Sequence, residues 1–334
     1  MKRLDTTKKI KVCLTLLLIS ILFVSGVFTV SADENSVYLG GFAAGFTINT
    51  RGAEVIALSD VVTEDGVTSP CKEADIKPGD VILSIGDIKT DEYADVQNVL
   101  DKCKGAPVEL KVLRGGETIV KTVLPAKDLS GKYKLGLLLR DKLTGIGTVT
   151  FIKDNKEFMA LGHAVCSENG KPIEIVGGNL YACSIFAVEK GQRGKAGELR
   201  GMFLSDASIG VIDKNLTVGI KGSVKDDFDL KKLNRIKVGE AHPGKASIVT
   251  TVNGIIPEEF SISIVKVDAD KKDNRNFVIS VTDKKLNEYA GGIVQGMSGS
   301  PIVQDGKLVG AVTHVFISDS TKGFGIAIDK MLAN

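Results

Sequence analysis

The stretch from Gly291 to Val312, GGIVQGMSGSPIVQDGKLVGAV, constrains the fold of this chain more than any other segment. A turn rich in glycine and serine leads into two short apolar runs, IV and LVGAV. Short apolar runs bounded by turn residues are typical of buried β-strands. Many similar Val/Ile runs, 37 glycines and an aromatic content of 5% extend this pattern, and they predict a mainly β protein.

Ser298, inside this turn, is the candidate nucleophile. Gly296 lies two residues earlier and can adopt dihedral angles closed to other residues, so the N–H groups of Gly296 and Ser298 could form an oxyanion hole. A glycine- and serine-rich hairpin loop without chemistry has the same composition. The spacing of GMSGSP resembles the G-D-S-G-G-P of chymotrypsin-like peptidases, from which Met297 and Ser300 depart, and it favours a nucleophile.

A serine nucleophile needs a base, and the chain has 3 histidines. His163, in FMALGHAV, precedes Ser298 as the chymotrypsin-like order requires, and it is the candidate base. The alternative for His163 is a core histidine bonded to a backbone carbonyl. His242, in GEAHPGK, is expected in an exposed loop. His314, in GAVTHVF, is expected to pack beside the site, with a second possible role in lining the substrate specificity pocket.

A carboxylate that orients the base is the least determined member of the site. Asp283 ends an apolar run fifteen residues before Ser298, while Asp206 and Asp213 also lie between His163 and Ser298. Each could equally be a turn residue bonded to its own backbone. The residues alone leave this choice open.

The segments MALGHAV, VTD, GGIVQGMSGSPIVQDGKLVGAVTHVF and TKGFGI resemble the stage IV sporulation protein B family of sporulation signalling serine peptidases. The resemblance implies that His163, Asp283 and Ser298 form the charge relay. It also implies cleavage of the chain itself and of a membrane-bound regulatory protein, in the space between the two forespore membranes, which triggers late sigma-factor activation. The chain is short between its apolar N-terminal segment and the next module, so self-cleavage sites cannot be transferred.

Residues 1–32 contain a basic tip and an uncharged apolar run from Val12 to Val30, and they predict a signal peptide or a membrane anchor. Lys and Arg exceed Asp and Glu by only 43 to 41, so no basic surface for nucleic acid is expected. The 5 cysteines are irregularly spaced and predict neither a disulfide framework nor a zinc site. No cofactor or metal is expected.

Residues 36–127 are expected to form a PDZ domain, with an amphipathic helix in EYADVQNVLDKC and a hairpin across Gly115-Gly116. Ala44, Gly45 and Phe46 are the candidate peptide-binding loop, where backbone N–H groups would capture a peptide terminus. Residues 136–334 are expected to form a trypsin- or chymotrypsin-like double β-barrel.

Three functions fit these features. The first is a membrane-associated serine endopeptidase that signals through a few specific cuts, with peptide tails bound by the PDZ domain. The second is a general envelope stress protease, which is disfavoured because those enzymes carry PDZ modules after the protease domain. The third is a PDZ scaffold whose peptidase-like domain is not catalytic.

Overall fold

The computed structural model of the protein describes residues 35–90, 93–167, 170–268 and 270–334; the side chains of 93–95 also lie outside the description. The membrane segment expected at residues 1–32 falls outside these ranges. Within the described ranges, no helix is long and apolar enough to cross a membrane. Residues Val37–Asn334 form one compact unit.

A first β-barrel is built from strands that pair antiparallel in a closed ring. In order around the ring, these strands are β2 (Ala43–Leu58), β11 (Leu137–Ile152), β12 (Glu157–Ala160), β16 (Gly219–Val224), β15 (Gly210–Leu216) and β13 (Ile175–Glu189), which pairs again with β2. Alternate residues at the start of β2, Ala44, Phe46 and Ile48, face inward, and Val149 and Leu180 are among the other buried side chains that fill the barrel.

A second β-barrel closes in the same way. In order, its strands are β18 (Gly244–Thr250), β19 (Glu258–Val267), β20 (Phe277–Val281), β23 (Asp319–Ala327), β22 (Lys307–Phe316) and β21 (Pro301–Gln304), which pairs again with β18. Phe260, Phe277 and Val312 belong to its buried core. The predicted double barrel is therefore present, and closure leaves neither ring with a free edge.

Short elements cover or join the barrels. They are β1 (Ser36–Leu39), β14 (Glu198–Phe203), the 3₁₀ turn η1 (Leu230–Lys232), β17 (Arg235–Val238), α4 (Lys284–Ala290) and α5 (Ile328–Leu332). β14 extends the edge of β13, and β17 runs parallel to β22.

A PDZ module has its own core, formed by buried residues such as Val55, Ile82, Leu100 and Leu110. Its elements are the end of β2, then β3 (Val61–Thr63), β4 (Gly66–Thr68), α2 (Pro70–Glu73), β5 (Val81–Ile85), β6 (Ile88–Lys89), α3 (Tyr93–Cys103), β7 (Val108–Arg114), β8 (Glu117–Val123), β9 (Ala126–Lys127), β10 (Tyr133–Lys134) and the start of β11.

The expected helix and hairpin of this module are both present. α3 buries Val96 and Leu100 on one face, as its spacing predicted. β7 and β8 pair across Gly115 and Gly116, whose φ angles of 62° and 97° only glycine adopts readily.

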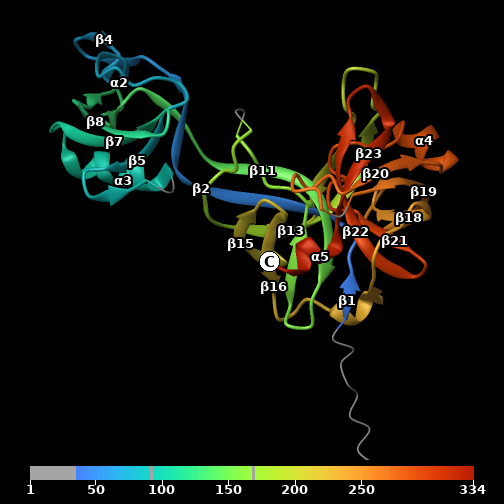
Figure 1. Ribbon diagram of the computed structural model, residues 1–334. Coiled ribbons are helices and arrows are strands. Elements are labelled where there is room, and N and C mark those ends of the chain that lie inside the picture. The colour runs from blue at the N-terminus through green and yellow to red at the C-terminus, as the bar shows by residue number, and fades with distance from the viewer. Residues whose placement is uncertain (1–34, 91–92, 168–169, 269) are drawn as a thin grey trace, which may run out of the picture. The chain divides into compact units, whose positions relative to one another are not determined.

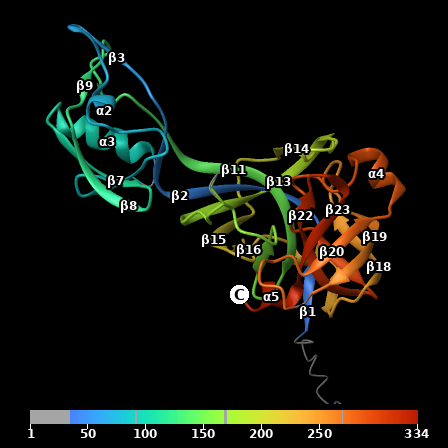
Figure 2. The same cartoon turned by 45° about the horizontal axis from the view of Figure 1, so that its top comes forward.

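The PDZ module is inserted into the first barrel, which corrects the expected boundaries of 36–127 and 136–334. β2 and β11 lie side by side in both cartoon views, and Asn49 pairs with Lys142 (Figures 1 and 2). The early part of β2 therefore belongs to the barrel, while Leu135, Leu137 and Leu139 pack in the PDZ core. The cause is the length of β2 and β11: each has 16 residues, enough to serve two cores in succession.

Candidate active site

Ser298 lies in the tight turn between α4 and β21. Gly291, with a left-handed φ of 73°, caps the C-terminus of α4 and ends the helix. Gly299 follows the nucleophile with a φ of 92°, and a Cβ atom there would lie 2.1 Å from the Thr148 carbonyl oxygen. Only glycine fits this close approach of the turn to β11, which explains the glycine after Ser298.

Two backbone amides of the turn are free to bind an anion. Gln295 O accepts from Leu199 N at 2.9 Å, and Met297 O accepts from Ser300 N at 3.0 Å. Because N–H and C=O point in opposite directions in a trans peptide, the N–H groups of Gly296 and Ser298 are directed away from these contacts. Within the described chain, neither N–H has a hydrogen-bond partner. This is the arrangement expected of an oxyanion hole.

His163 follows β12 through a sharp turn in which Leu161 and Gly162 have φ angles of 69° and 70°. Its Nδ1 lies 2.8 Å from the Ala164 carbonyl oxygen. A carbonyl can only accept, so Nδ1 carries the proton and Nε2 is left as the acceptor. Burial lowers the pKa of His163, which keeps the imidazole neutral and able to accept a proton.

Ser298 and His163 line one cavity of about 470 Å³, which brings the predicted nucleophile and base together. Many of the other lining residues are apolar, including Leu161, Ile293 and Val315. In this structure Ser298 Oγ donates to the Thr313 carbonyl oxygen at 2.8 Å. The nucleophile must therefore turn from this carbonyl toward His163 for reaction, and catalytic hydrogen bonds often tighten only when substrate binds.

His314 lies against His163 in the same cavity. The two ring centroids are 4.8 Å apart with a tilt of 35°. Burial, followed by repulsion from His163 in its protonated form and from Arg275, lowers the pKa of His314 to about 4. Its Nδ1 is buried and has no hydrogen-bond partner among the described residues. The expected position beside the site is therefore observed, while a part in substrate specificity stays a prediction.

His242 is an exposed loop residue, as expected. Its Nε2 lies 2.8 Å from Asp305, and this carboxylate raises its pKa.

In the described part of the chain, no hydrogen bond or ion pair joins Asp283 to His163, so its part in the charge relay stays a prediction. Its two carboxylate oxygens accept hydrogen bonds from Leu286 N at 3.0 Å and Ser261 N at 3.2 Å, so it caps the N-terminus of α4. The rivals Asp206 and Asp213 are exposed. No carboxylate of the described ranges is hydrogen-bonded to the His163 ring.

Ala44, Gly45 and Phe46 are not a peptide-binding loop, and this prediction is wrong. They lie near the start of β2, where this strand pairs with β11 on one edge and with β13 on the other. Ala44 and Phe46 are buried in the first barrel core. No edge is free there to accept a peptide strand.

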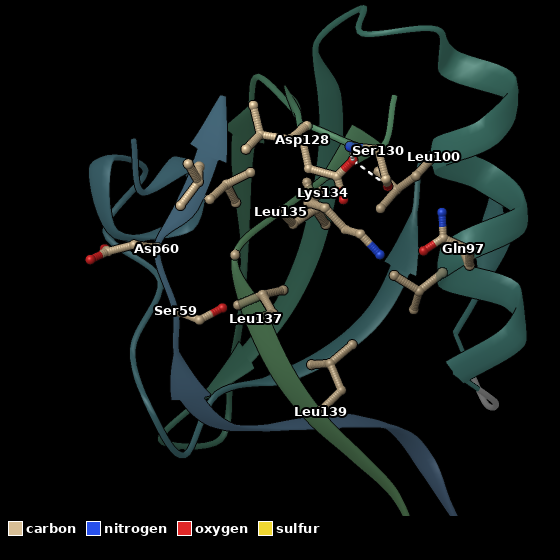
Figure 3. Close-up of a pocket in the computed structure, with 15 residues that line it drawn as sticks. Ser59, Asp60, Gln97, Leu100, Asp128, Ser130, Lys134, Leu135, Leu137 and Leu139 are labelled. Atoms are coloured by element: carbon tan, nitrogen blue, oxygen red, sulfur yellow. Dashed lines mark hydrogen bonds between the residues drawn. The ribbon is translucent and has the colours of Figure 1, made fainter. Parts of the chain in front are cut away.

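A groove suited to a peptide lies elsewhere in the PDZ module, between α3 and the start of β11. This cavity of about 450 Å³ is lined by Leu100, Leu135, Leu137 and Leu139, among others (Figure 3). Lys134 extends toward Gln97 of α3 in the same view. The sequence signal that could have located it is YKLGLLL, which places a glycine between apolar residues at the start of a strand.

Backbone groups at the end of this groove are available for a peptide carboxylate. The N–H groups of Leu135 and Gly136 have no partner among the described residues, and Gly136 has a φ of 73°. Consecutive N–H groups in such a conformation form an anion-binding nest. Ser59 N donates to Gly136 O at 3.0 Å, which makes Leu137 and Leu58 a non-hydrogen-bonded pair. Leu137 therefore directs its own N–H and C=O away from β2, toward the open edge.

An oxyanion hole beside a serine, with a neutral histidine in the same cavity, serves the attack of a hydroxyl on a carbonyl carbon, and the double barrel is a fold that serine peptidases use. The protein is thus of the serine peptidase class. Residues 131–332, more than half of the chain, match the family described as SpoIVB peptidase S55, and the chain belongs to this family. Residues 62–114 match the PDZ domain family.

Similarity to individual proteins is more limited. A Clostridium perfringens (strain 13 / Type A) protein named "Putative zinc metalloprotease CPE1693" is 36% identical over 87 residues, which are 25% of this chain and 26% of that protein. The chain thus spans about a quarter of that relative's length. The crystal structure of Rv3671c protease in its inactive form is 16% identical, with a TM-score of 0.31, and covers 56% of this chain and 81% of that one. Among the described residues, no group of three or more His, Cys, Asp or Glu is placed to hold a metal ion.

Proposed function

We propose that this protein is a signalling serine endopeptidase of sporulation, which cleaves itself and a membrane-bound regulatory protein and so triggers late sigma-factor activation. It would be exported across or anchored in the forespore membrane by residues 1–32 and act in the space between the two forespore membranes. The PDZ groove would select the partner by adding its peptide to the edge of β11.

The observation that carries this proposal is the pairing of a peptidase site with a separate peptide groove in one chain. The peptidase site can cleave a peptide bond. The groove offers free backbone amides and apolar lining residues, which can restrict cleavage to partners whose C-terminal peptide fits. A general stress protease would instead degrade unfolded protein without such restriction, and a non-catalytic scaffold would need no free amides beside Ser298.

A charge reversal at the groove tests partner selection. Lys134→Glu places a negative charge beside the nest and should repel a peptide carboxylate, whereas Lys132→Glu makes the same change at an exposed position outside the groove. We expect Lys134→Glu to slow cleavage of the co-expressed membrane regulator severalfold, while labelling by a fluorophosphonate probe stays at the wild-type rate. The Ser298→Ala variant provides the inactive reference.

Three results would count against the proposal. Equal cleavage of the regulator by the two Lys variants would remove the groove from partner selection. Rapid digestion of unfolded casein by the wild-type protein would favour the stress protease. Absence of fluorophosphonate labelling in the folded wild-type protein would favour the scaffold.

A further inference from the structure

Every carbonyl from Gln295 to Gly299 is held by a hydrogen bond. Backbone donors hold Gln295 and Ser298: Leu199 N donates to Gln295 O at 2.9 Å, and Thr148 N donates to Ser298 O at 3.0 Å. Side-chain hydroxyls bond the other three carbonyls, those of Gly296, Met297 and Gly299, and Met297 O also accepts from Ser300 N at 3.0 Å. Each of the five carbonyls in the turn that carries Ser298 thus has a hydrogen-bond donor that restrains its orientation.

Two of these hydroxyls bond the carbonyls of two successive peptide groups, Gly296–Met297 and Met297–Ser298, and the second group contains the free N–H of Ser298. Thr148 Oγ1 donates to Gly296 O at 2.9 Å, and Ser300 Oγ donates to Met297 O at 2.6 Å. Both side chains are completely buried, with an exposed fraction of 0%. A buried hydroxyl without a hydrogen-bond partner destabilises the folded state, so both hydroxyls are expected to keep their bonds to these carbonyls.

The carbonyl of Met297 and the N–H of Ser298 belong to one planar peptide group. Holding the carbonyl at one side therefore directs the N–H to the opposite side, into the oxyanion hole. Thr148 holds the peptide group that joins Gly296 to Met297, between the two free amides; the N–H of the same group donates to Val294 O at 3.1 Å. Without the Thr148 hydroxyl this group is held at one end only, and Gly296, whose φ of 95° lies in a region that glycine adopts readily, can rotate relative to it.

We propose that Thr148 and Ser300 are positioning residues of this peptidase: their hydroxyls hold the turn so that the amides of Gly296 and Ser298 point at the developing oxyanion. Ser300 occupies a position that is glycine in G-D-S-G-G-P, so this chain adds a side-chain donor there. Thr148 lies on β11 of the first barrel, and it thereby ties the orientation of the oxyanion hole in the second barrel to the packing of the first.

The test uses the full chain and a fluorophosphonate, whose phosphoryl oxygen must occupy the oxyanion hole as Ser298 attacks. Rates at increasing probe concentration give the maximal rate of modification and the concentration for half-maximal rate. We expect Thr148→Val and Ser300→Ala to lower the maximal rate by about tenfold each, less than the roughly 10²–10³-fold loss typical when an oxyanion donor is removed. The half-maximal concentration should change by less than about twofold, because ground-state binding is not affected.

Two further variants separate positioning from general stability. Thr148→Ser restores the hydroxyl and should recover most of the rate. Thr251→Val removes a buried hydroxyl that bonds Gly41 O and Ala43 N and no carbonyl of the turn, although Ala43 pairs with Thr148; it should leave the maximal rate unchanged. Unfolding temperatures confirm that each variant is folded.

The proposal is overturned if folded Thr148→Val and Ser300→Ala proteins react at the wild-type maximal rate. It is also overturned if Thr251→Val loses as much rate as they do, or if Thr148→Ser does not recover, since both results indicate a purely structural effect. Should either valine variant fail to fold, Ser300→Ala still tests the proposal. It removes the hydroxyl but keeps the backbone hydrogen bond from Ser300 N to Met297 O, so the turn is expected to fold.

Discussion

At the scale of single residues, the base of this site is oriented by the backbone. The Ala164 carbonyl accepts the Nδ1 proton of His163 at 2.8 Å and so selects the tautomer whose Nε2 can receive the serine proton. In a Ser-His-Asp triad this task falls to a carboxylate. Asp283 is used instead to cap α4, so the family resemblance and the geometry assign it different roles.

Substitutions at Asp283 separate these two roles. Asn keeps one acceptor oxygen and can still cap α4 through Leu286 N, but its NH2 group cannot accept from Ser261 N, and Ala lacks both acceptors. We expect Asp283→Asn to keep its fluorophosphonate reaction rate and to lose less stability than Asp283→Ala, which should lose about 1 kcal/mol. A folded Asp283→Asn protein with a rate reduced by about 10⁴-fold would instead support the charge relay.

The pH dependence of labelling reports the state of His163. Burial lowers its pKa below 6.5, so the imidazole stays neutral as the pH falls through 6.5. We expect the acid limb of the fluorophosphonate reaction to have its midpoint below pH 6.5. A midpoint at or above 6.5 would contradict a buried base.

The pH dependence of labelling also includes any loss of folded protein at low pH. Between pH 6.5 and about 4 the unfolded chain binds a proton at His314 that the folded protein does not, so stability falls as the pH decreases through this window. Circular dichroism at each pH identifies the range in which the protein is folded.

At the scale of elements, strand pairing on both edges of β2 determines why Gly45 is a glycine. The AAGF segment reads as a loop in isolation, yet Gly45 is a strand residue because the Phe203 ring occupies the space beside it. A Cβ atom at Gly45 would lie 1.9 Å from that ring. The glycine is needed for packing between β2 and β14.

Gly45→Val should therefore destabilise the peptidase barrel rather than block peptide capture. Overpacking of a core typically costs about 1–3 kcal/mol, and we expect a lower unfolding temperature. Gly145→Val is the matched control, since Gly145 pairs with Phe46 but a Cβ atom there meets no atom within 4 Å. Equal unfolding temperatures of the two variants would show that Phe203 moves aside without cost.

At the scale of the whole molecule, the PDZ module is an insertion between two neighbouring strands of a barrel. Thr50 Oγ1 already donates to Asp141 O at 3.2 Å across the base of the insertion. An antiparallel pair can be closed by a two-residue turn, for which Asn-Gly is favoured. The barrel strands therefore do not need the module for their pairing.

We expect a protein in which Asn-Gly replaces residues 51–140 to fold and to react with a fluorophosphonate. The same protein should no longer select the membrane-bound regulatory protein that we propose as its substrate, because the groove is gone. Gel filtration, circular dichroism and labelling check the first expectation, and co-expression with the regulator checks the second. Failure of the shortened protein to fold would mean that the two cores depend on each other.

The sequence by itself determined the local features: the nucleophile turn, the placement of His163 before Ser298, α3, and the hairpin at Gly115-Gly116. Each follows from dihedral preferences or periodicity within a few residues, and the GMSGSP spacing together with the resemblance gave the family. The tertiary structure decided which segments share a core. The boundary inside β2, the location of the peptide groove and the role of Asp283 depend on strand pairing between residues far apart in the chain, and such pairing leaves no local trace in composition or spacing.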